Sequence, residues 1–220
     1  MADPATRLAA VQDAIARACR TARRDPTEVT LVAVSKTRSA EEIEALLALG
    51  QREFGESRVQ ETADKWPALR MLYPDARLHL IGRLQSNKAA EAVAQFDIVH
   101  SLDRPSLLKA LVEAGEKAGR FPLCFVQVNV GEEQQKGGVA LSALPGFLDQ
   151  VRASPLPLAG LMAIPPAGVQ ATPYFALLSE LARRHDVDGL SMGMSGDYPS
   201  AVMLGATVVR VGSALFEDPT

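Results

Sequence analysis

A lysine between two hydroxyl residues, Ser35 and Thr37, is the residue of this sequence whose setting most directly suggests chemistry. Lys36 follows residues 31–34 (LVAV), an apolar and partly β-branched run that is typical of a strand buried on both faces. A lysine held against an apolar core can lose its proton near neutral pH and form an imine with an aldehyde. Alternatively, its side chain simply extends from the strand end into water. These seven residues alone leave both interpretations open.

The rest of the chain alternates predicted strands and helices. Eight apolar runs predict strands that begin near residues 30, 53, 78, 97, 124, 158, 189 and 208. A helical pattern follows each of the first seven, and another helix over residues 6–23 precedes the first strand. Pro67 should break the predicted helix 59–72 near its middle. Eight such units in 220 residues predict a single (β/α)8 barrel domain over residues 1–220, with little space for a second domain.

In such barrels the active site lies at the carboxyl ends of the strands, and phosphate commonly binds after strands seven and eight. Lys36 ends the first predicted strand and Ser57 follows the second. The loops at 191–197 (SMGMSGD) and 210–214 (RVGSA) follow the last two strands and offer glycine N–H groups, hydroxyls and a cation. Such groups bind anions well. A phosphate cup opposite an imine-forming lysine suggests a phosphorylated aldehyde, and pyridoxal 5′-phosphate (PLP) is the commonest such cofactor.

The sequence allows two roles for the guanidinium of Arg210. Its guanidinium could pair with a carboxylate at the barrel rim. It could instead face the pyridine nitrogen of the cofactor, where a fixed cation would discourage ring protonation and weaken the electron sink that carbanion chemistry needs. Position alone favours neither.

Composition excludes several other classes of protein. The formal net charge of −3 gives no strong basic field for nucleic acid or an anionic membrane. Cys19 and Cys124 lack CxxC spacing and the three histidines are isolated, so we expect no disulfide and no metal site. The N-terminus has no hydrophobic signal core and no apolar run approaches membrane-spanning length. We therefore expect a soluble cytoplasmic protein.

Several motifs together resemble one known family. They are residues 32–37 (VAVSKT), 54–56 (FGE), 59–61 (VQE), 79–88 (HLIGRLQSNK) and the C-terminal runs. In family order, from the first strand through Phe216, they resemble the pyridoxal phosphate homeostasis proteins, also called proline synthetase co-transcribed homologues. This resemblance implies a barrel like the N-terminal domain of alanine racemase, fold type III among PLP proteins.

The resemblance also implies a binding role. Family members are regarded as PLP carriers or regulators of vitamin B6 and amino-acid balance without an established reaction. Lys36 would carry PLP as a Schiff base, and Ser57 stands where the family usually has asparagine. Leu78 replaces a common tryptophan, and Glu217 replaces a glycine. The predicted cofactor-binding residues are Lys36, Ser57, His79, Met192, Ser195, Arg210, Gly212 and Ser213.

Two other functions remain as alternatives. An amino-acid racemase of this type uses a second domain that supplies a catalytic tyrosine, which we do not expect in a chain that stops at Thr220. A barrel aldolase would use Lys36 on a sugar phosphate. Lys136 is either a solvated loop charge or a second amine that helps PLP transfer. We expect a monomer whose partners, besides PLP, are apo PLP-dependent enzymes.

Overall fold

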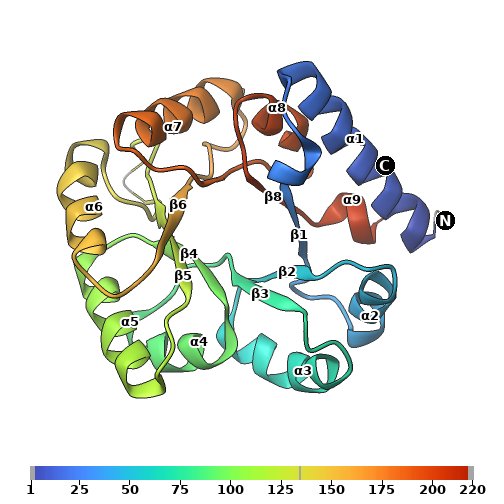
Figure 1. The fold of residues 1–220 in the computed structure, drawn as a ribbon, viewed down its shortest axis with the longest axis horizontal. Helices are drawn as coiled ribbons and strands as arrows, with labels where there is room; N and C mark the ends of the chain where they lie inside the picture. The colour runs from blue at the N-terminus through green and yellow to red at the C-terminus, as the bar shows by residue number, and fades with distance from the viewer. Residues whose placement is uncertain (1–2, 134, 218–220) are drawn as a thin grey trace.

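The strands form one closed parallel barrel. The computed structural model describes residues 3–133 and 135–217, and the strands follow chain order around the ring (Figure 1). They are β1 (Thr30–Val34), β2 (Glu53–Glu56), β3 (Arg77–Leu80), β4 (Ile98–Leu102), β5 (Leu123–Gln127), β6 (Leu158–Met162), β7 (Leu190–Ser191) and β8 (Val208–Val211). Because β1 pairs with both β2 and β8, the predicted (β/α)8 barrel is confirmed.

Helices follow each of the strands and surround the barrel (Figure 1). Short 3₁₀ turns at Pro26–Glu28, Ser86–Lys88 and Leu141–Ala143 complete the connections. The helices are α1 (Pro4–Ala22), α2 (Ala40–Ala48), α3 (Val59–Leu72), α4 (Ala89–Gln95), α5 (Pro105–Ala118), α6 (Leu144–Arg152), α7 (Thr172–Arg184), α8 (Tyr198–Met203) and α9 (Ser213–Phe216).

The apolar side chains divide into two cores. The larger one fills the space between the sheet and the helices and includes Phe54, Trp66, Phe96 and Phe175. The smaller one consists of Val32, Ile98, Phe125, Met162 and Val208. These five come from β1, β4, β5, β6 and β8 and so fill the barrel interior, as expected for strands buried on both faces.

The predicted N-terminal helix is present, with slightly different bounds. It begins at Pro4, not at residue 6, because the Asp3 carboxylate accepts a hydrogen bond from the N–H of Thr6 and proline suits a first helical turn. It ends at Ala22, one residue before the predicted end, because Arg23 adopts a left-handed conformation with φ of 56°. That residues 1–220 form one domain stays a prediction, since both ends of that range lie outside the described residues.

Pro67 does not break its helix, so that expectation is wrong. The helix α3 runs from Val59 to Leu72 with Pro67 inside it. Proline removes one hydrogen bond to the carbonyl four residues earlier, which here belongs to Ala63. Both residues are exposed, so water can hydrate that carbonyl.

Other boundaries differ by little. Four strands begin one residue away from the predicted start, at 77, 98, 123 and 190. None of the helices in residues 3–133 and 135–217 is long and apolar enough to cross a membrane.

Candidate cofactor site at the barrel mouth

Lys36 is exposed on the loop that follows β1, while the residues around it are held in place. Ser35 is fully buried, and its hydroxyl donates to Oε1 of Glu56 at 2.7 Å. The Nζ of Lys65 donates to the carbonyl oxygen of Ser35 at 2.9 Å. The N–H of Thr37 donates to Oε1 of Glu61. The loop is therefore fixed on both sides of a lysine whose own amine faces solvent.

The backbone at Thr37 is strained. Its φ is +64°, a left-handed conformation that is unusual for a β-branched residue. Such conformations cost about 1–3 kcal/mol and persist where the surrounding structure over-determines them. The contacts from α3 to Ser35 and Thr37 provide that constraint.

Glu56 is the buried centre of this arrangement. Its carboxylate has no exposed surface, and Oε1 accepts from Ser35, from the Trp66 indole at 2.9 Å and from the Lys65 ammonium at 2.9 Å. Oε2 is also buried and has no hydrogen-bond partner among the described residues. A buried carboxylate needs such compensation, since desolvation of an unpaired charge is costly.

The loops after β7 and β8 meet next to the end of β1. The backbone N–H of Gly212 donates to Oγ of Ser195 at 3.1 Å, which links the two loops. A Cβ at Gly212 would lie 3.4 Å from Cβ of Val34, two residues before Lys36. Gly193 has φ of +94°, and a Cβ there would lie 2.6 Å from Cβ of Ala201, so this turn requires glycine.

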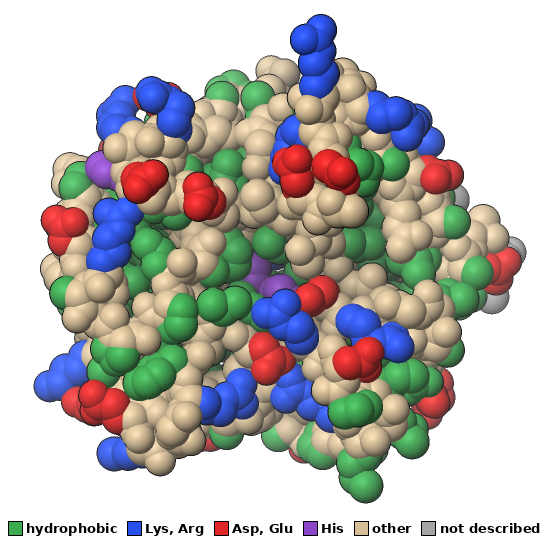
Figure 2. Space-filling model, viewed as in Figure 1, with side chains coloured by type: hydrophobic (Ala, Val, Ile, Leu, Met, Phe, Trp, Pro, Cys, Tyr) green, Lys and Arg blue, Asp and Glu red, His purple; other side chains and the backbone are tan. Residues whose placement is uncertain are grey.

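A chain of buried hydrogen bonds crosses the barrel interior and ends on Arg210. We call Glu53, His79, His100, Ser191 and Arg210 the polar chain. Arg210 donates through Nη1 to Oγ of Ser191, which lies 2.8 Å from Nδ1 of His100. Nε2 of His100 lies 2.8 Å from Nδ1 of His79, and Nε2 of His79 lies 2.6 Å from Oε2 of Glu53. Figure 2 shows histidine at the centre of the hollowed face, framed by charged side chains.

One set of proton positions satisfies the whole polar chain. If both histidines are neutral and carry the proton on Nε2, each donates toward Glu53 and each accepts on Nδ1. The Ser191 hydroxyl then donates to His100 and accepts from Arg210. All four hydrogen bonds point the same way, from a cation at one end to a carboxylate at the other, which lets them strengthen one another.

The electrostatics of the polar chain agree with these protonation states. Burial lowers the pKa of His100 well below its ordinary value, and the charges of His79 and Arg210 lower it further. Burial also lowers the pKa of His79, against the opposing effect of Glu53. Burial lowers the pKa of Arg210 to about 10, so its guanidinium stays charged at neutral pH. For Glu53, burial opposes ionisation, but the bond to His79 and the charge of Arg77 keep its pKa below the ordinary value.

The environment of Arg210 bears on its two interpretations. Its guanidinium is bonded to the Ser191 hydroxyl and, through Nη2, to the carbonyl oxygen of Ala163 at 3.1 Å. Neither partner is a carboxylate, and Arg210 forms no ion pair with another described residue. Because nothing neutralises the guanidinium directly, it can act as a fixed cation toward a bound ring.

The structure brings some predicted residues together and separates others. Ser195, Gly212 and Ser213 lie on the two joined loops, and Met192 is fully buried beneath them, with its N–H bonded to the carbonyl of Val208. His79 is different, because both its ring nitrogens bind residues of the polar chain. It reaches Arg210 only through His100 and Ser191.

Two further residues have other surroundings than the sequence suggests. Ser57 lines a cavity at the carboxyl ends of β2 and β3. Lys136 forms an ion pair with Glu133 at 2.7 Å and donates to the carbonyl of Pro165 at 3.3 Å. It is therefore not a freely solvated charge, and a role in PLP transfer stays a prediction.

Sequence reasoning missed the residues that support the site. Glu56 and Ser191 belong to quoted motifs, but nothing in their spacing reveals their partners. Lys65 sits on the polar face of a helix and His100 at the end of an apolar run, as many unremarkable residues do. Among the described residues, no three His, Cys, Asp or Glu side chains form a group that could hold a metal ion.

The residues at the barrel mouth fit a phosphorylated aldehyde. Lys36 is exposed, so an aldehyde can reach its amine. The N–H groups of Ser213 and Ala214 open α9 and have no acceptor within that helix, and Ser195 places a hydroxyl beside them. The fold and this site thus define a single-barrel protein with an accessible lysine beside a phosphate-binding loop pair.

Comparison with known proteins gives the family. The family model described as "Alanine racemase, N-terminal domain" matches residues 7–219. The pyridoxal phosphate homeostasis protein of Synechocystis is 40% identical over 205 residues, covering 88% of this chain and 93% of the relative. That of Escherichia coli K12 is 36% identical over 228 residues, with 98% and 97% covered. The chain belongs to the alanine racemase N-terminal domain family and, within it, to the pyridoxal phosphate homeostasis proteins.

Solved structures agree with this assignment. PipY of Synechococcus elongatus with PLP bound superimposes with a TM-score of 0.79 at 39% identity, covering 92% of this chain and 99% of PipY. Alanine racemase from Corynebacterium glutamicum matches with a TM-score of 0.64 at 19% identity, and the match spans 62% of that longer chain. This second likeness establishes the shared fold.

Proposed function

We propose that this protein binds pyridoxal 5′-phosphate covalently through the amine of Lys36 and takes part in PLP and amino-acid homeostasis. The observation that carries the proposal is the likeness to PipY, whose solved structure holds PLP. The solvent-facing amine of Lys36 next to the joined loops after β7 and β8 supports it on this chain's own residues. When bound, the cofactor supplies an aldehyde for the lysine and a ring that can accept electrons.

Each residue at the mouth has a role in this proposal. Ser195, Gly212 and Ser213 bind the phosphate through hydroxyl and N–H groups, and Met192 supports their loop from below. Arg210 faces the ring nitrogen, where its charge keeps the nitrogen unprotonated. Ser57 and His79 are proposed to lie near the ring, although His79 has both nitrogens bonded within the protein.

We favour a carrier or regulator over an enzyme. Racemisation needs a second acid on the opposite face of the ring. Tyr198, the tyrosine nearest the rim, is only 8% exposed, and burial raises its pKa, so it is a poor proton donor. The unprotonated ring nitrogen favoured by Arg210 also weakens carbanion chemistry. The proposal further includes a cytoplasmic monomer that passes PLP to apo-enzymes.

Absorption spectroscopy tests the proposal. Wild-type protein mixed with PLP should gain the visible band of an imine, and Lys36→Ala should not. Borohydride reduction followed by peptide mass spectrometry should locate the cofactor on Lys36. An intact wild-type protein that stays colourless with excess PLP, or a label on another lysine, would refute it. A barrel aldolase would show no visible imine band as purified.

Isotope exchange separates the carrier from a racemase. The PLP-loaded protein should exchange the Cα hydrogen of alanine in D2O no faster than free PLP does. A clearly faster rate that disappears in Lys36→Ala would make the protein an enzyme.

A further inference from the structure

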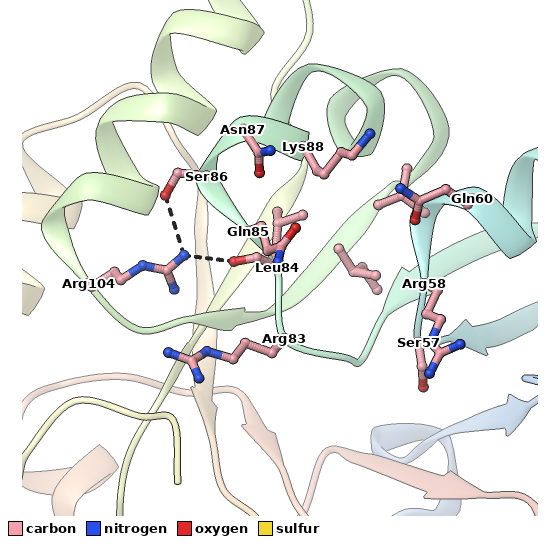
Figure 3. A pocket seen from close by; sticks show the side chains of 12 residues that line it. Ser57, Arg58, Gln60, Arg83, Leu84, Gln85, Ser86, Asn87, Lys88 and Arg104 are labelled. Atoms are coloured by element: carbon pink, nitrogen blue, oxygen red, sulfur yellow. Dashed lines mark hydrogen bonds between the residues drawn. The ribbon is translucent and has the colours of Figure 1, made fainter. Parts of the chain in front are cut away.

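A cavity lies beside the barrel mouth, at the carboxyl ends of β2, β3 and β4. It has a volume of about 720 Å³, within the range of pockets that hold small molecules. Of the predicted cofactor residues, it includes only Ser57. Its walls are the loop and first turn of α3, the loop from Arg83 to Lys88, and Arg104 before α5 (Figure 3).

This cavity is strongly basic in a protein with a net charge of −3. Arg58, Arg83, Lys88 and Arg104 all line it, and no aspartate or glutamate does. Figure 3 shows the guanidinium groups of Arg83 and Arg104 at the left, Arg58 at the right and Lys88 at the top. Lys88 is paired with Glu91 and Arg104 with Asp103. The side chains of Arg58 and Arg83 form no hydrogen bond or ion pair within the described residues.

Part of the wall is held in place by contacts within the protein. Arg104 donates to the carbonyl of Leu84 at 2.8 Å and to the hydroxyl of Ser86 at 3.3 Å, which orients its guanidinium. A Cβ on Gly82 would lie 2.2 Å from the carbonyl oxygen of Ser57, so only glycine allows these two loops to touch. Preorganised donors lose less entropy on binding.

The lining also offers an apolar floor and neutral donors. Val59, Leu80 and Leu84 are buried side chains at its base. The amides and hydroxyls are those of Gln60, Gln85, Asn87, Ser57 and Ser86. Arg58 and Arg83 are exposed cations without a bonded partner among the described residues. They favour a ligand with at least two negative charges, and the floor favours an uncharged body that packs on it.

We propose that this cavity binds a nucleotide-like organic phosphate, with its phosphates on Arg58 and Arg83 and its ring on the apolar floor. The site adjoins that of the proposed PLP cofactor and shares only Ser57 with the predicted cofactor residues. The first turn of α3, which lines this cavity, is also bonded to the Lys36 loop, because Glu61 in that turn accepts a hydrogen bond from the N–H of Thr37.

Calorimetric titration of ADP into full-length, PLP-loaded protein tests the site. We expect saturable binding that weakens with added salt and by about tenfold in Arg83→Gln or Arg58→Gln, as for the loss of one charged hydrogen bond. Adenosine, which lacks phosphate, should not bind, and inorganic phosphate should compete. Arg184→Gln, an exposed arginine on α7, is the matched control and should bind like wild type.

Three results would overturn the proposal. They are the absence of saturable ADP binding, equal weakening in Arg184→Gln, and loss of the visible PLP band on adding ADP, which would mean that ADP occupies the cofactor's own phosphate loops. Because the PLP band is read in the same sample, a failure of the proposed PLP function is recognised independently.

Discussion

At the scale of residues, the Lys36 amine is left free while its neighbours are held. Ser35 and Thr37 are bonded to Glu56 and Glu61, which lie more than twenty positions away in the sequence. An apolar strand that ends in a lysine is visible within seven residues. The partners of Ser35 and Thr37 cannot be identified from these seven residues, because only the folded barrel brings Glu56 and Glu61 close to them.

Ser191 links the charged end of the polar chain to its histidines. Ser191→Ala removes one buried hydrogen-bond partner from Arg210 and one from His100, so the free energy of unfolding should fall by about 1–3 kcal/mol. PLP should also bind more weakly, because Arg210 loses its orientation. Urea unfolding and PLP titration measure both effects, with the exposed Ser106→Ala as control. A variant as stable as wild type would show that the polar chain does not hold Arg210.

The polar chain also predicts acid sensitivity. His79 and His100 have pKa values below the ordinary 6.5. Below pH 6.5 these two histidines are therefore protonated in the unfolded chain but still neutral in the folded chain. Stability should therefore be constant with respect to these groups above pH 7 and fall between pH 6.5 and 5.5. The slope per histidine is at most about 1.4 kcal/mol per pH unit.

Denaturation at several pH values checks this dependence. His100→Phe has a lower baseline stability, because His79 and Ser191 each lose one buried hydrogen-bond partner. Its slope between pH 6.5 and 5.5 should nevertheless be smaller than that of wild type. An unchanged slope would mean that His100 is not the group that titrates.

At the scale of elements, α3 fastens the loop after β1. Lys65 is 12% exposed and lies against the fully buried Glu56, so Lys65→Met leaves that carboxylate without its cation. We expect a loss of about 3–5 kcal/mol, as for a broken buried ion pair, and slower formation of the PLP band. Adding Glu56→Gln should recover part of the stability. If the double variant is less stable than the single one, the carboxylate is not the source of the cost.

The elements themselves were largely predictable. Alternating apolar runs and helical periods identify the strands and helices because each strand is buried on both faces. The prediction that Pro67 breaks its helix was wrong, because the rule that proline breaks helices takes no account of whether the position is exposed. The solvent around Ala63 can hydrate the carbonyl that Pro67 leaves without a donor, which a buried site would not allow.

At the scale of the whole molecule, α1 joins the two ends of the barrel. It packs against α8 and α9, and Arg7 donates to the carbonyl of Leu215 at 2.9 Å. Ile15 of α1 is 5% exposed and belongs to the larger apolar core. Ile15→Ala should lower stability by about 2–5 kcal/mol, measured by thermal unfolding beside the exposed Asp13→Ala. A loss equal to that of Asp13→Ala would mean that α1 is not part of the cooperative fold.

The sequence by itself determined the barrel, the place of Lys36 at its mouth, and the loops after the seventh and eighth strands. These follow from local patterns: hydrophobic period, turn residues and strand count. Only the tertiary structure decided what surrounds Lys36 and Arg210, that His79 belongs to the polar chain, and that four basic residues form a cavity. Those features depend on side chains from different strands and helices meeting, and closure of the barrel brings them together.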